Sequence, residues 1–155
     1  MIQEAQPAVL LDVHFRPVWA QITPLREYVQ TWVGAQAPKL SERTEIVLQE
    51  LLENAVKYGD RSSNVRLELR IDRGHLGVEL KVSNKAHPKR MALLKQELEA
   101  MSTGGGAKDA FSRALERAKS LPPGISRLGL ARIVTEAQVD LKIQDDYVTF
   151  TAAIK

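Results

Sequence analysis

The chain has 155 residues, of which 22 are Lys or Arg and 19 are Asp or Glu, and its formal net charge is +3. This length suits one domain, which can bury a hydrophobic core without metals or disulfides. The absence of cysteine excludes a disulfide framework and thiolate chemistry, and it fits a reducing compartment. Basic residues are scattered among acidic ones and aromatic residues make up only 5%, which argues against nucleic-acid binding.

The N-terminal residues lack the basic start and the apolar run of a signal peptide. No stretch of the sequence approaches the roughly 18 uninterrupted apolar residues of a membrane-spanning helix. We therefore expect a cytoplasmic protein whose partners include neither membranes nor nucleic acids.

The first part of the chain predicts a strand and then a helix. Apolar residues alternate with others over residues 9–15, which predicts a strand that Pro17 ends. Apolar residues three and four apart predict a helix over residues 18–37, regular from about Pro24 onwards.

A second helix is expected from Ser41 to Tyr58. Ser41 has the side chain of a good N-cap. Leucines and alanine at helical spacing form an apolar stripe along the segment. Gly59 is expected to end the helix in the way that a C-terminal glycine usually does.

A hairpin follows this helix. Residues 65–72 and 76–84 alternate in polarity on either side of a turn signal at residues 72–75. The alternation predicts six buried apolar side chains: Val65, Leu67, Leu69, Val78, Leu80 and Val82. Asn84 has the same parity as the last three, so we expect it to face the helical layer.

The second half of the chain predicts three helices and two closing strands. A glycine-rich break at residues 102–106 separates the first two of these helices. The predicted segments are helices starting at Pro88, around residues 111–118 and over residues 127–138, then strands 139–144 and 147–154. The resulting order, β-α-α-β-β-α-α-α-β-β, predicts an α/β (α+β) two-layer sandwich: a mostly antiparallel five-stranded sheet with helices on one face.

Two polar residues on the second helix stand out as candidates for chemistry. Glu50 and Asn54 are four residues apart, so they lie on one helix face, beside the apolar stripe. A carboxylate and an amide oxygen suit a hard cation such as Mg²⁺, or a polarised water. By spacing alone, Glu50 could equally be a surface residue and Asn54 a satisfied polar group of the helix.

The segment around this pair resembles the N-box of the histidine-kinase-like (GHKL) ATPases, Glu-x-x-x-Asn-Ala-x-x-(Tyr/His)-Gly. The matching residues are Glu50, Asn54, Ala55, Tyr58 and Gly59. The resemblance implies a Bergerat-type ATP-binding fold over residues 1–155, with ATP and Mg²⁺ as cofactors. It further implies that Asn54 binds Mg²⁺ together with the phosphates, and that Glu50 is the catalytic residue that polarises the attacking water or hydroxyl.

The other boxes of this family are degenerate here. Asn84 lies where the family's Asp-x-Gly-x-Gly motif has the Asp that recognises the adenine amine, and both glycines are missing. The Asn84 amide oxygen can accept that hydrogen bond, or Asn84 merely ends a strand. Gly129 and Leu130 match the later glycine box, which brings backbone N–H groups to phosphates. Arg127 stands where a glycine is usual, and it could contact a phosphate, block close approach, or be a solvated arginine.

Residues 85–126, between these boxes, correspond to the family's variable lid over the nucleotide. Glycines 104–106 lower the cost of bending there. The alternative is a loose surface linker.

A lone ATPase domain of this size resembles the bacterial anti-sigma-factor serine kinases of the RsbW and SpoIIAB type. The resemblance implies an ATP-binding serine/threonine protein kinase in a partner-switching circuit, which phosphorylates a STAS-domain antagonist. A sigma factor is a second partner that it suggests, and a homodimer is also allowed. The alternative is a non-catalytic protein-binding module with the same fold and a decayed nucleotide site, which the missing glycines favour. An ATPase subunit of another kind is a third option.

Overall fold

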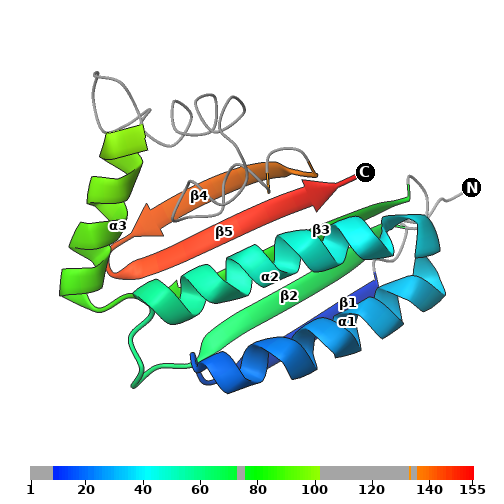
Figure 1. Cartoon of the computed structure of the whole chain (residues 1–155), viewed down its shortest axis with the longest axis horizontal. Helices are drawn as coiled ribbons and strands as arrows, with labels where there is room; N and C mark the ends of the chain where they lie inside the picture. Colours follow the sequence, from blue (N-terminus) through cyan, green and yellow to red (C-terminus); the bar gives the residue numbers. More distant parts are fainter. Residues whose placement is uncertain (1–8, 73–75, 102–132, 134–135) are drawn as a thin grey trace, which may run out of the picture.

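The computed structural model describes residues 9–72, 76–101, 133 and 136–155 (Figure 1). Five strands form one sheet in the order β1-β2-β3-β5-β4, and every neighbouring pair is antiparallel. The strands are β1 (Val9–Phe15), β2 (Val65–Asp72), β3 (Gly77–Lys85), β4 (Gln138–Gln144) and β5 (Tyr147–Ile154). The predicted α+β class with a five-stranded antiparallel sheet is therefore confirmed.

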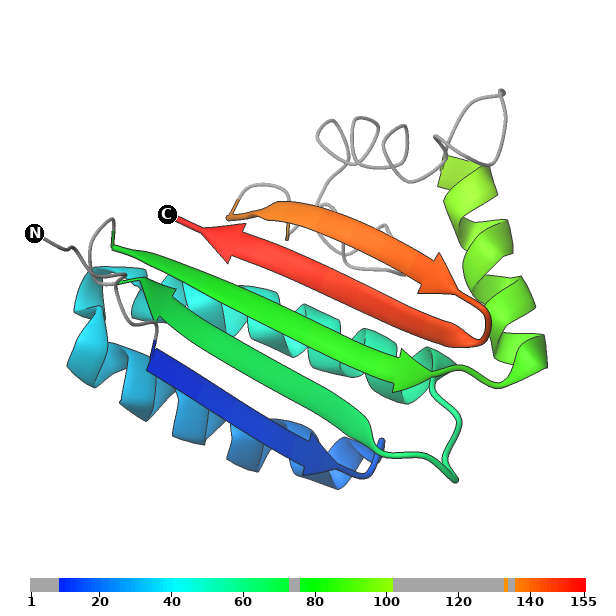
Figure 2. The same ribbon diagram turned by 180° about the vertical axis from the view of Figure 1, so that it is seen from behind.

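Helices cover one face of this sheet (Figure 1), and the view from behind shows the other face open (Figure 2). The α-helices are α1 (Ile22–Gln36), α2 (Ser41–Tyr58) and α3 (Pro88–Met101), and short 3-10 turns precede the first two, η1 (Trp19–Gln21) and η2 (Pro38–Leu40). α2 packs against α1 and contacts β3 and β5. α3 stands at the end of the sheet where β3 ends and β4 turns into β5.

The β2–β3 hairpin carries the centre of the core. All six side chains predicted to be buried are buried: Val65, Leu67, Leu69, Val78, Leu80 and Val82. Their β-strand periodicity of two directs them to the helix-covered face, where they meet Leu48, Leu51 and Leu52 of α2. Burying such a side chain stabilises the fold by roughly 1.5–3 kcal/mol.

Three local expectations needed correction. Ser41 is not an N-cap, because η2 runs directly into α2 and Leu40 takes the cap position; the Ser41 hydroxyl instead donates to the Gln30 carbonyl oxygen, 3.2 Å away. Gly59 does end α2, but its backbone is extended (φ −75°, ψ 152°) rather than left-handed. The regular helix α1 begins at Ile22, just before the expected position.

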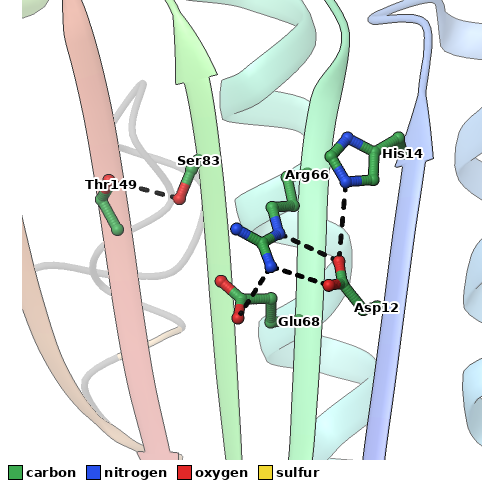
Figure 3. Close-up of polar contacts among 6 residues, drawn as sticks. All are labelled: Asp12, His14, Arg66, Glu68, Ser83 and Thr149. Carbon is green, nitrogen blue, oxygen red and sulfur yellow. Dashed lines mark hydrogen bonds and ion pairs between the residues drawn. The ribbon is translucent and has the colours of Figure 1, made fainter.

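The open face of the sheet is polar. Arg66 of β2 donates two hydrogen bonds to the Asp12 carboxylate of β1, at 3.0 and 2.7 Å, and it lies 3.6 Å from Glu68 (Figure 3). The Thr149 hydroxyl donates to the Ser83 hydroxyl across the neighbouring strands at 3.3 Å. These contacts are solvent-exposed or half-buried, so the open face needs no covering layer to satisfy its polar groups.

The predicted helices around 111–118 and over 127–138 fall mostly outside the described residues. Ile133 is helical and fully buried, but Glu136 lies in a turn and Gln138 is the first residue of β4, so the second of these helices ends earlier than predicted. Within the described residues, no helix is both long enough and apolar enough to cross a membrane.

Candidate functional site

The polar pair predicted on α2 is buried. Glu50 is 9% exposed and Asn54 is 2% exposed, and neither side chain is without a partner in the chain. Both lie on an 18-residue helix whose apolar residues pack onto the sheet, so the i, i+4 spacing places them together at the border of that packed face. A buried carboxylate costs free energy unless it is paired or hydrogen-bonded. Glu50 is therefore not the surface residue that spacing alone would have allowed.

Asn84 is also buried, with 4% exposure, and it faces the helical layer as its parity predicted. A Cβ built on Gly59 would lie 3.2 Å from the Asn84 Nδ2 atom, so this amide rests against the end of α2. The same Cβ would collide with the Ala55 carbonyl oxygen. Glycine at this position thus permits the close approach of the end of α2 and the end of β3.

Backbone contacts hold this corner of the molecule together. Gly59 forms an isolated antiparallel bridge with Ala86, and the Asp60 N–H donates to the Lys85 carbonyl oxygen at 2.7 Å. The Ala86 N–H donates to the Asp146 carbonyl oxygen at 2.8 Å. The end of α2, the end of β3 and the β4–β5 turn are therefore fixed relative to one another.

Arg90 adds a side-chain tie that sequence reasoning missed. It lies in the first turn of α3, and its Nη1 atom donates to the Gly59 carbonyl oxygen at 2.8 Å. A cation at the C-terminal end of a helix also interacts favourably with the helix dipole. No local sequence signal marks Arg90, because its partner is 31 residues away, at the cap position that follows α2.

Charged groups of both signs lie near this corner. Hydrogen bonds from the Ser62 backbone N–H and hydroxyl hold the pKa of the Asp60 carboxyl below its usual range, and the charges of Lys85 and His87 lower it further. Lys85 also lies 3.6 Å from the Asp146 carboxylate. The carboxylate of Asp60 is thus kept in its charged, hydrogen-bonded form by its surroundings.

Glu53, next to Asn54 in sequence, lies elsewhere. Its Oε2 atom accepts a hydrogen bond from the Gln49 side chain at 2.9 Å, and Gln49 in turn accepts from Arg26 of α1 at 2.6 Å. Glu53 is therefore linked through Gln49 to the α1–α2 contact, and it is half-buried. Glu50 and Glu53 have separate surroundings, which makes them a matched pair for mutation.

Part of the predicted site lies outside the described residues: Arg127, Gly129 and Leu130, and the lid from residue 102 to residue 126. The start of the predicted lid is described, and it differs from a loose linker. Lys85 belongs to β3, Ala86 is bridged to Gly59, and α3 forms a regular helix to Met101. Lys85, Ala86 and the first turn of α3 are therefore tied to the core.

The donor atoms present fit the chemistry that the family resemblance implies. Glu50 and Asn54 supply a carboxylate and an amide oxygen, the hard donors that Mg²⁺ takes in small numbers when phosphates and waters complete its coordination. The described residues contain no group of three or more His, Cys, Asp or Glu that could hold a metal by themselves. Asn84 offers Oδ1 as an acceptor for a ligand amine, since its Nδ2 donates to the Lys85 carbonyl oxygen at 3.3 Å.

Comparisons with known proteins agree on the fold. A chain of the SiaB–SiaC complex from Pseudomonas aeruginosa superposes with a TM-score of 0.56 and 14% sequence identity, over 93% of this chain and 88% of that chain. The match establishes a shared fold. Neither protein-family models nor the sequences of curated proteins match the chain.

Proposed function

We propose that this protein is an ATP-dependent serine/threonine protein kinase of a bacterial partner-switching circuit, which phosphorylates a small STAS-domain antagonist. The observation that carries the proposal is the buried Glu50/Asn54 pair on the N-box helix, with Asn84 against the last turn of that helix. A carboxylate and two carboxamides buried on the covered side of the sheet have no packing purpose that apolar residues would not serve better.

Each residue has a role in this proposal. Bound Mg-ATP supplies the phosphoryl group and neutralises charge as it is transferred. Asn54 holds the metal through its amide oxygen, and Asn84 accepts a hydrogen bond from the adenine amine. Glu50 orients the serine hydroxyl of the partner and accepts its proton. Arg127, Gly129 and Leu130 contact the phosphates in the same proposal.

The partner in this proposal is a protein. The similar chain was crystallised in a complex of two proteins, SiaB and SiaC, which supports a protein-binding role for this fold. A STAS-domain antagonist and a sigma factor are the partners that the resemblance to anti-sigma-factor kinases suggests.

A second candidate is a binding module that has lost nucleotide turnover. Asn84 favours this alternative, because an amide carries no charge where the family uses a carboxylate, and a hydrogen bond to a neutral group is worth about half as much. The two candidates differ in whether Glu50 is needed for chemistry.

A phosphotransfer assay with a STAS-domain protein encoded beside this one separates the two. Glu50→Gln keeps the size and polarity of the side chain but removes the base, so transfer should fall by about 10²- to 10⁴-fold while nucleotide affinity stays nearly unchanged. Glu53→Gln is the matched control and should leave transfer intact, because the Glu53 carboxylate is hydrogen-bonded to Gln49 and points about 100° around the helix from Asn54. Full transfer by the Glu50→Gln variant would refute the kinase. If wild-type protein bound Mg-ATP but never phosphorylated the partner, the binding module would be the better account.

A further inference from the structure

A histidine caps the N-terminal end of α3. His87 directly precedes Pro88, the first residue of the helix, and the His87 carbonyl oxygen accepts the first helical hydrogen bond, from the Met91 N–H at 2.8 Å. The Nδ1 atom of its imidazole accepts a second hydrogen bond, from the Lys89 backbone N–H at 3.2 Å. Serine, threonine, aspartate and asparagine usually fill this position, because their side-chain oxygens accept the free N–H groups of the first turn. Histidine differs from them because its accepting atom can take up a proton near neutral pH.

The cap depends on the neutral form of the imidazole. A neutral imidazole has one nitrogen that accepts and one that donates, whereas an imidazolium donates from both nitrogens and accepts from neither. Protonation of His87 therefore removes the acceptor for the Lys89 N–H. It also places a positive charge at the positive end of the helix dipole, which is unfavourable. His87 is exposed, so protons from the solvent reach it directly.

A carboxylate near His87 can receive the charged form. Asp60 lies in the connection that follows α2; hydrogen bonds from Ser62 lower the pKa of its carboxyl most, and the charges of Lys85 and His87 lower it further. Both hydrogen bonds from Ser62 reach the Asp60 Oδ1 atom, at 2.9 and 2.7 Å, which leaves Oδ2 for another donor.

The other charged groups of this corner leave Asp60 as the partner for an imidazolium. They are Lys85 of β3, Asp146 of the β4–β5 turn, and Lys89 and Arg90 of α3. Three of the four are cations, and the carboxylate of Asp146 already lies 3.6 Å from the Lys85 amine.

The first turn of α3 also holds the tie to α2. Arg90 lies in this turn, and its Nη1 atom donates to the Gly59 carbonyl oxygen. Ala86, directly before His87, forms the β-bridge with Gly59. The cap therefore fixes the turn from which Arg90 reaches the end of α2, so loss of the cap loosens this tie.

We propose that His87 is a pH-sensitive switch at the start of α3. In its neutral form it caps the helix. In its charged form it releases the Lys89 N–H, turns to the Asp60 carboxylate and loosens the tie between Arg90 and the end of α2. None of the residues assigned to the nucleotide takes part, so the switch stands whether or not the protein is a kinase.

An NMR titration of the wild-type chain between about pH 5 and 8 tests the switch at the atoms involved. As His87 is protonated, the Lys89 amide proton should lose its hydrogen bond and shift upfield, with the same midpoint as the His87 ring protons. Its hydrogen exchange, corrected for the intrinsic effect of pH, should become about fivefold faster. A nuclear Overhauser effect between the ring and the Asp60 β protons should appear only in acid. A Lys89 amide that does not move while the His87 ring titrates would overturn the proposal.

Substitutions at the two histidines that the structure describes separate His87 from other titrating groups. His87→Asn keeps a capping side chain that does not titrate, so the Lys89 amide should stay hydrogen-bonded over the whole pH range. His14→Asn is the matched control on the open face of the sheet and should leave the Lys89 titration as in the wild type. Both positions are exposed, and circular dichroism would verify that the variants fold. If the Lys89 amide titrated equally in the His87→Asn variant, another group would control the cap and the proposal would fail.

Discussion

On the covered side of the sheet, Glu50 and Asn54 of α2 and Asn84 of β3 are buried, whereas on the open side Asp12 and Arg66 form an ion pair in solvent. The two sides use similar residue types under opposite conditions. Burying a carboxylate or an amide costs free energy that the fold must recover elsewhere, while an exposed ion pair costs little and contributes little. Polar residues on the covered side are therefore the stronger indication of function.

The largest expected effect concerns the close approach at the covered corner. Gly59→Ala should lower the free energy of unfolding by about 1–3 kcal/mol, because the added methyl group meets the Ala55 carbonyl and the Asn84 amide. Chemical denaturation would measure it. Gly34→Ala in α1 is the control: its Cβ would meet only the Ser41 hydroxyl at 3.7 Å, so it should stabilise by about 0.5–1 kcal/mol. Equal effects of the two substitutions would contradict the account of Gly59.

The second prediction asks whether the buried pair binds a ligand. Asn54→Ala removes an oxygen that the proposed function assigns to the metal, and a hydrogen bond or ligand contact of that kind is worth roughly 1.5–3 kcal/mol. Affinity for Mg-ATP, measured by calorimetry, should fall about tenfold to a hundredfold. If wild-type protein did not bind nucleotide at millimolar concentration, the buried pair would not be a nucleotide site.

On the covered side, sequence patterns predicted which residues are buried, but they did not predict the contacts between distant segments. Strict alternation fixed which residues of β2 and β3 are buried, and the same parity placed Asn84 correctly, because side-chain direction in a strand follows from position alone. The spacing of Glu50 and Asn54 likewise predicted a shared helix face. Strand parity and helix spacing depend only on position along the chain, so they can be read from the sequence alone.

The misses concern contacts between distant segments. Gly59 is needed partly because Asn84 of β3 lies against it, and Arg90 of α3 is held by a hydrogen bond to the Gly59 carbonyl oxygen. Each contact joins elements that are far apart in the sequence. Ser41 looked like an N-cap, but the preceding turn at Pro38–Leu40 continues the helical path and displaces it. Tertiary packing decides such features, and no local pattern encodes them.

The third prediction restores the family's charge at the covered corner. Asn84→Asp should strengthen nucleotide binding about fivefold, because a carboxylate accepts the adenine amine more strongly than an amide. The same change removes the donor to the Lys85 carbonyl oxygen and buries a charge, so the melting temperature should fall. Calorimetry and thermal melting measure the two effects separately. Weaker nucleotide binding by this variant would show that Asn84 does not face the base.

The smallest expected effect is on the open side. Hydrogen bonds from Arg66 hold the pKa of the Asp12 carboxyl below its usual value, so the folded state favours the charged form. A depressed pKa contributes stability above the unfolded pKa, near 3.8, and that contribution is lost as the pH falls through the folded value. Asp12→Asn should therefore lower the melting temperature only slightly at neutral pH, and the difference from wild type should vanish in acid.

Solvent exposure decides the size of this last effect. Asp12 and Arg66 are both well exposed, so water and salt screen their attraction, and added salt should shrink the difference further. Thermal melts at several pH values and salt concentrations would measure it. Gly59→Ala on the covered side, melted in parallel, should keep its full effect in salt, because a steric collision is not screened. If Asp12→Asn destabilised the protein as much as Gly59→Ala, the open face would hold the fold together as strongly as the covered one, and burial would no longer distinguish the two sides.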